Sequence, residues 1–156
     1  MMTNYKVLWI VIVFLLIALL GVGVKFVVLG NTLPSDDGRT QVLLDGHERQ
    51  LVLGEMRQLL SATQQITEGL AANNLAQVAT AASEVGMQAT STMDVRLKAK
   101  LPIDFKKLGY ATHQAFDEIA TLANTKTDNR AIQVKLAETM NLCLACHASY
   151  QLPIIK

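Results

Sequence analysis

The 156-residue sequence has few of the residues that mark several common protein classes. Two cysteines are too few for a disulfide-rich scaffold, and three prolines and nine glycines are too few for a collagen-like or low-complexity chain. The net charge is only +1, and aromatic residues make up 5% of the chain. A balance this close to neutral lacks the basic excess on which nucleic-acid binding depends, so we expect no nucleic-acid partner.

The residues present in excess are apolar, and they gather at the amino end. Every residue from 7 to 24 is apolar or glycine, and residues 26–29 continue the run after Lys25. At about 1.5 Å per helical residue, positions 7–29 cover roughly the 30 Å hydrocarbon core of a bilayer, with Lys25 near enough to one end to reach the headgroups. The sequence therefore predicts a transmembrane helix that contacts lipid through residues 7–29.

A cleaved secretory signal peptide is the alternative interpretation of this run. Its apolar core usually has about 7–15 residues and is followed by a small-residue cleavage site of the Ala-x-Ala kind. Here the run is longer, and no such site follows it. We therefore interpret residues 1–30 as an uncleaved signal anchor.

The rest of the chain divides into a tether and one domain. Residues 31–46 contain Pro34, Asp36, Asp37 and Gly38, which favour turns, so we predict a tether there, with residues 42–44 able to pack back onto the domain. Residues 47–156 are long enough to bury a core of their own.

The spacing of apolar residues in 47–156 follows a helical period four times. The predicted helices cover about residues 46–70 and 74–90, a third that begins at Pro102, and a fourth that Asp128 caps and Pro153 ends. A basic connector, residues 93–104, joins the second to the third. The expected fold is all-α: a four-helix up-down-up-down bundle after one transmembrane helix. The predicted inward stripe of the fourth helix consists of Ile132, Leu136, Met140, Cys143, His147 and Tyr150.

Both cysteines lie in one pentapeptide, Cys143-Leu144-Ala145-Cys146-His147. Cys-x-x-Cys-His is the attachment signature of c-type haem. Helix positions i, i+3 and i+4 share a face, so both sulfurs can form thioethers with the two vinyl groups on one side of a porphyrin. His147 then supplies the proximal iron ligand. We predict one covalently attached haem c.

Two other uses of this motif are weaker. A thioredoxin-like pair is typical of the start of a helix in a βαβ unit, whereas here the motif lies near the end of the last predicted helix. A zinc site needs a fourth ligand, for which the sequence offers only His47 or His113, at spacings unlike those of zinc motifs.

A Cys-x-x-Cys-His near the carboxyl end of a four-helix domain resembles the class II c-type cytochromes, the cytochrome c′ family. The resemblance covers roughly residues 47–152 and includes the ending Cys-Leu-Ala-Cys-His-Ala-Ser-Tyr and the stretch 108–117. The sequence departs from the family pattern at Gln151, where a basic residue is common, and in its anchor. Since bacteria attach this haem outside the cytoplasm, the resemblance implies a single-pass protein of the bacterial inner membrane with its haem domain in the periplasm.

The family divides according to the group on the other side of the iron, and two registers of the first helix are open. If Arg49 is aligned with the arginine that the family carries in its first helix, the resemblance places Leu53 over the iron and implies an open apolar site. If the helix is aligned instead from the loop at residues 72–73, Met56 lies within one residue of that position. Gly54, which lets a porphyrin approach, favours Met56 as the distal ligand. Arg49 and Arg57 are candidate propionate partners, because guanidinium binds carboxylate with two hydrogen bonds.

These features predict an electron carrier rather than an enzyme, with membrane redox proteins or complex subunits as partners at the periplasmic face. It could belong to a larger respiratory or photosynthetic complex, and homodimer formation stays open. The alternative function is a five-coordinate cytochrome c′ that binds NO or CO.

The cations of the connector and third helix are either a solvated face or a docking patch for an acidic redox partner. They are Arg96, Lys98, Lys100, Lys106 and Lys107.

Overall fold

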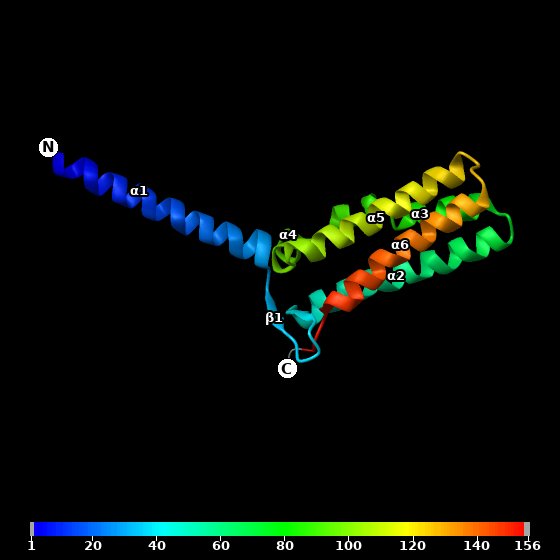
Figure 1. Ribbon diagram of the computed structural model, residues 1–156, viewed down its shortest axis with the longest axis horizontal. Coiled ribbons are helices and arrows are strands. Elements are labelled where there is room, and N and C mark those ends of the chain that lie inside the picture. The colour runs from blue at the N-terminus through cyan, green and yellow to red at the C-terminus, as the bar shows by residue number, and fades with distance from the viewer. Residues whose placement is uncertain (1, 155–156) are drawn as a thin grey trace.

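The computed structural model describes residues 2–154 of the chain. Within them the protein is mostly helical, and the predicted all-α class is confirmed (Figure 1). An amino-terminal helix, α1 (Met2–Gly23), extends away from a group of packed helices and continues as a π-helix, η1 (Val24–Leu29). The packed helices are α2 (Gly46–Ala71), α3 (Leu75–Glu84), α4 (Val95–Lys100), α5 (Ile103–Asn124) and α6 (Asn129–Ser149).

The amino-terminal helix is apolar on every side. Tyr5–Leu29 forms a stretch of 25 residues with a mean hydropathy of 3.1, and none of it is buried against the rest of the chain. Such a helix is long and apolar enough to cross a bilayer, as predicted for residues 7–29, although a signal sequence has the same properties.

Local capping explains where the predicted helices begin. Asp45 and Glu48 form a reciprocal capping box: the Asp45 side chain accepts from the Glu48 amide at 2.9 Å, and the Glu48 side chain accepts from the Asp45 amide at 3.0 Å. Asn74 caps α3 by accepting from the Gln77 amide at 3.2 Å. Pro102 and Asp128 stand at the N-caps of α5 and α6, as expected.

The second predicted helix is too long, and part of the predicted connector is helical. α3 ends at Glu84 rather than near residue 90, because Gly86 is extended (φ −71°, ψ −172°) and lies against Asp117 of α5. A 3-10 helix, η2 (Met87–Thr92), follows, and its first amide donates to Asp117 at 3.0 Å. Asp94 caps α4 within the connector.

The prediction of a tether without regular structure is wrong. Residues 31–46 contain two short strands, β1 (Thr32–Pro34) and β2 (Thr40–Val42), which pair antiparallel. β3 (Tyr150–Gln151) pairs parallel to β2. This pairing ends α6 at Ser149, before Pro153 is reached. Val42 and Leu44 do pack back onto the domain, as expected, with 0% and 2% of their surface exposed.

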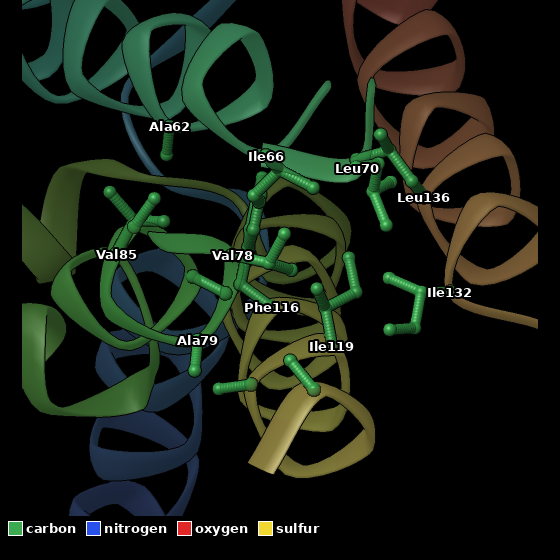
Figure 2. Close-up of a cluster of buried hydrophobic side chains, with 14 residues drawn as sticks. Ala62, Ile66, Leu70, Val78, Ala79, Val85, Phe116, Ile119, Ile132 and Leu136 are labelled. Carbon is green, nitrogen blue, oxygen red and sulfur yellow. The ribbon is translucent and has the colours of Figure 1, made fainter. Parts of the chain in front are cut away.

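Two apolar clusters hold the helices together. The larger joins α2, α3, α5 and α6 around Phe116, Ile119 and Ile132 (Figure 2). The smaller lies at the end of the domain nearest α1 and unites Val42, Leu44, Val52, Leu97, Leu101 and Phe105. α3 packs closely on α2 and α5, and α5 on α6, whereas α2 and α6 contact each other little. The seam between α2 and α6 is therefore the open side of the domain.

Candidate cofactor-binding site

A cleft of about 190 Å³ opens at the end of the seam between α2 and α6 that lies near the strands. The structure brings together there four of the residues singled out from the sequence: Leu53 and Met56 of α2, and Cys146 and His147 of α6. The remaining lining residues are Arg39, Phe105, Tyr150, Gln151 and Leu152. The cleft is thus shared by the first helix of the domain, the Cys-x-x-Cys-His motif and the segments on either side of it.

The motif occupies the last turns of α6. Cys143 and Cys146 are half-buried free thiols, and the Cys143 sulfur lies 3.8 Å from the Thr139 carbonyl oxygen. The predicted inward stripe of this helix is wrong at two positions, because His147 is exposed and Met140 is 42% exposed. Thr139 and Cys146 take the inward places instead.

Helical spacing shows which way the exposed residues of α6 face. Met140, Leu144 and His147 are separated by four and three residues and share one flank of the helix. The opposite flank carries Lys135, which forms a salt bridge with Glu118 of α5. Since His147 lines the cleft with residues of α2, the flank with Met140 and Leu144 borders the seam.

The facing flank of α2 is equally apolar. Leu53, Met56 and Leu60 follow one another at spacings of three and four, and the first two line the cleft. Leu60 is 70% exposed and Leu144, across the seam, is 67% exposed. Exposed large apolar side chains on both borders of an open seam are typical of a binding site for an apolar group. The residues present therefore fit a flat, largely apolar cofactor held from α6.

The two thiols are poorly suited to dithiol chemistry. Burial raises the pKa of the Cys143 thiol, and burial together with the neighbouring Cys143 raises that of Cys146. Reactive thiolates have a lowered pKa and are common at helix amino termini, whereas these thiols lie at the carboxyl end of α6. This arrangement disfavours the thioredoxin-like alternative.

A zinc site is disfavoured as well. Among the described residues, no three His, Cys, Asp or Glu side chains come together in a way that could hold a metal ion. His113, one of the two candidate fourth ligands, is engaged elsewhere: its Nδ1 lies 2.7 Å from the Val85 carbonyl oxygen and its Nε2 3.1 Å from Glu55.

The two arginines named as propionate partners differ in position. Arg49 is half-buried, and its Nε donates to the Leu152 carbonyl oxygen at 2.9 Å, next to the cleft. Arg57 is exposed and does not line the cleft. Gly54 also lies away from the cleft: the nearest atom to a methyl group placed there belongs to Arg57, at 3.7 Å. Gly54 therefore gives no support to Met56 as a ligand.

Arg39 is a cleft residue that the sequence did not suggest. Its guanidinium donates to Asp37 at 2.8 Å and to the Gln151 side chain at 3.2 Å. Hydrogen bonds from Arg39 lower the pKa of Asp37 to about 2, so the pair stays ionised even in mild acid. Arg39 and Gln151 are 112 residues apart, and no local pattern indicates that they meet.

The carboxyl-terminal segment forms one wall of the cleft. The Tyr150 ring meets the Phe105 ring edge to face, with centroids 5.2 Å apart. The Gln151 side chain donates to the Ser35 hydroxyl, and the Gln151 backbone pairs with β2. The segment that follows His147 is therefore fixed to the tether and to α5.

Comparisons of the chain with protein-family models, with curated proteins and with solved structures found no match.

Proposed function

We propose that this protein is a membrane-anchored monohaem c-type cytochrome that transfers single electrons at the periplasmic face of the bacterial inner membrane. The observation that carries the proposal is the Cys143-x-x-Cys146-His147 motif at the edge of an open, apolar seam. Motif and seam support each other, because the motif specifies how haem is attached and the seam offers exposed apolar side chains for it to cover.

The chain's own groups have separate tasks in this proposal. Cys143 and Cys146, one helical turn apart, would hold the haem through thioethers, and the His147 imidazole would bind the iron. Haem c would supply a one-electron iron couple. Leu53, Met56 and Leu60 of α2, across the seam, would contact the haem and keep water away. Arg39 and Arg49, near the mouth, are the cations best situated to receive the propionates.

The arrangement of the long helices supports a bundle of the cytochrome c′ kind. α2, α3, α5 and α6 run in alternating directions along the length of the domain in Figure 1. The connection between α2 and α3 is short, at residues 72–74, and η2 and α4 form a longer one before α5. Four-helix bundles with this alternation seat cofactors among side chains of facing helices. We assign the domain, residues 47–156, to this four-helix up-down-up-down class.

Met56 is our proposed sixth ligand. It lines the cleft together with His147 and is partly buried against the smaller apolar cluster. As an iron ligand together with histidine, its thioether would raise the reduction potential and favour the ferrous state, which suits a carrier. Leu53 lines the same cleft one turn away, and it favours the second candidate function, an open iron site that binds NO or CO.

The location follows from the anchor. A helix over residues 5–29 that is retained in the mature protein confines the haem domain to one membrane, and haem attachment outside the cytoplasm puts residues 31–156 in the periplasm. Electron partners are then restricted to proteins at the same membrane, including subunits of a larger respiratory or photosynthetic complex.

The two candidate functions are separated by optical spectra of the oxidised and reduced protein, with and without carbon monoxide. The native protein should be low-spin in both states and bind no carbon monoxide. Met56→Ala should become high-spin, lower the potential and bind carbon monoxide, whereas Leu53→Ala, the matched control from the same cleft, should stay low-spin. A native protein that is high-spin and binds carbon monoxide readily would make Leu53 the distal residue and the gas-binding function the better one.

A further inference from the structure

The end of the apolar helix is fitted directly onto the junction between α4 and α5. Gly30 is buried with φ +64°, and a methyl group there would lie 2.5 Å from the Lys100 carbonyl oxygen and 2.6 Å from the Pro102 nitrogen. The next amide, that of Asn31, donates to the same Lys100 oxygen at 2.7 Å. Only glycine permits both this backbone angle and this approach. The end of the apolar run therefore lies against the carboxyl-terminal part of the basic connector.

Two lysines meet the last turn of the apolar helix. The Lys106 ammonium donates to the Val27 carbonyl oxygen and the Lys25 ammonium to the Gly30 carbonyl oxygen, each at 2.8 Å. The Lys25 side chain thus extends from the apolar helix toward the domain. If the helix crosses a bilayer, this direction brings the ammonium group to the membrane surface on the domain side. If residues 5–29 cross the bilayer, the Lys106 nitrogen lies at the depth of Val27, at the boundary of the hydrocarbon.

The neighbouring cations differ in how far they are neutralised. Lys100 pairs with Glu48 and Asp45, and Lys107 pairs with Asp104 at 2.9 Å. Arg96 is exposed and Lys98 half-exposed, and neither forms a salt bridge within residues 2–154. We call Lys25, Arg96, Lys98 and Lys106 the juxtamembrane basic patch.

We propose that the juxtamembrane basic patch binds the headgroups of anionic phospholipids and so fixes the haem domain against the membrane surface. The inference rests on the membrane anchor of the proposed function. Anionic headgroups attract Lys and Arg by Coulomb forces that act over about a Debye length, roughly 8–10 Å. The contact with Val27 holds Lys106 inside that distance, and α4, which carries Arg96 and Lys98, contacts η1 at the end of the apolar helix. The cleft is lined by Phe105, the neighbour of Lys106, so the patch holds the cofactor site close to the lipid.

Hydrogen exchange of the full chain in lipid nanodiscs tests this proposal. Residues 93–108 should exchange more slowly in discs that contain phosphatidylglycerol than in discs of phosphatidylcholine alone, and high salt should remove the difference. The double variant Arg96→Gln, Lys98→Gln should lose the lipid-dependent protection. Each substituted cation should lower the protection factor by about fivefold, which corresponds to ~1 kcal/mol per cation.

The matched control is Lys126→Gln with Arg130→Gln, which removes two exposed cations from the opposite end of the domain, one in the loop between α5 and α6 and the other in the first turn of α6. This variant should keep the full protection. Equal exchange in both kinds of disc, or equal lipid-dependent protection in both double variants, would contradict the proposal and return the cations to the role of a protein-docking face.

Intact mass of the chain recovered from cell membranes separates this inference from the anchor on which it rests. A mature chain that lacks residues 1–30 would contradict both the anchor and the lipid contact. A chain that keeps them and exchanges independently of the lipid would contradict the lipid contact alone.

Discussion

His113 is the buried titratable residue with the clearest consequence for stability. Only 5% of it is exposed, and both ring nitrogens face acceptors, the Val85 carbonyl and the Glu55 carboxylate. A neutral imidazole has one N–H, so only the imidazolium satisfies both. Burial alone would lower the pKa of His113, but the hydrogen bonds to Glu55 and Val85 and the charge of Asp117 outweigh it and raise the pKa above 6.5.

A raised pKa in the folded state makes stability depend on pH in one direction. Below about pH 6.5 the folded and unfolded forms are both protonated, and the stabilising contribution is complete. As the pH rises through the folded pKa, the contribution is lost, so the free energy of unfolding should fall from pH 6.5 upward.

Urea unfolding of the holoprotein across this range measures the effect. Glu55→Gln should weaken the fall, because the carboxylate that favours the imidazolium is gone. His47→Gln is the control variant, because His47 is exposed and lies outside this pair. An identical pH dependence in the native protein and in Glu55→Gln would contradict this account of the pair.

At the residue scale, what could be predicted from the sequence is what depends on close neighbours in the chain. The spacing of Cys143, Cys146 and His147 predicts haem attachment from the motif alone, and this stays a prediction. Met56 and Leu53 could be assigned to the cleft but not separated, because residues three apart on a helix face the same way. Arg39 and Gln151 meet only through pairing of distant strands, and no spacing within either segment indicates it.

Among the elements, α2 and α3 pack most closely where a glycine allows it. A methyl group at Gly69 would lie 2.9 Å from the Val78 side chain and 3.1 Å from the Asn74 carbonyl oxygen. Val78 is fully buried, so it has no room to move away. The approach of these two helices therefore depends on the absence of a side chain at position 69.

Gly69→Ala should destabilise the protein by about 1–3 kcal/mol, because the methyl group overpacks the core. Gly109→Ala is the matched control within α5: no described atom beyond its own helix backbone lies within 4 Å of that methyl group. It should stabilise the protein by about 0.5–1 kcal/mol through helix propensity. Thermal unfolding followed by circular dichroism measures both changes, and equal effects in the two variants would contradict the packing argument.

The elements that sequence reasoning predicted correctly are those with strong local signals. α2 has a long apolar stripe and a capping box, and α5 and α6 begin directly after their N-cap residues Pro102 and Asp128, so their starts agree with prediction. The end of α3 is different, because it depends on contact between Gly86 and Asp117, 31 residues away. The pairing of β2 with β3 was missed for the same reason, because Thr40 and Tyr150 are far apart in the chain. β1 and β2 do pair with each other locally, but each has only three residues, too few for an alternating pattern to be recognised.

At the scale of the whole molecule, the tether joins the amino-terminal apolar helix to the cleft. Its first residue, Asn31, is hydrogen-bonded to the α4–α5 junction, and its second strand pairs with the segment after His147. The end of the apolar helix, the basic connector and the carboxyl-terminal wall of the cleft thus meet at one end of the domain (Figure 1). In the proposed function, this arrangement keeps the cofactor of an electron carrier near the membrane.

The central claim is that Cys143 and Cys146 bind one haem covalently, and the intact mass of the full chain after acid–acetone extraction tests it most directly. The protein, purified from membranes of cells that mature c-type cytochromes, should keep a mass increased by one haem. The variant with both Cys143→Ala and Cys146→Ala should yield little holoprotein, because the seam is left without the group that fills it. A native chain at the unmodified mass, with haem extracted or never bound, would contradict the account.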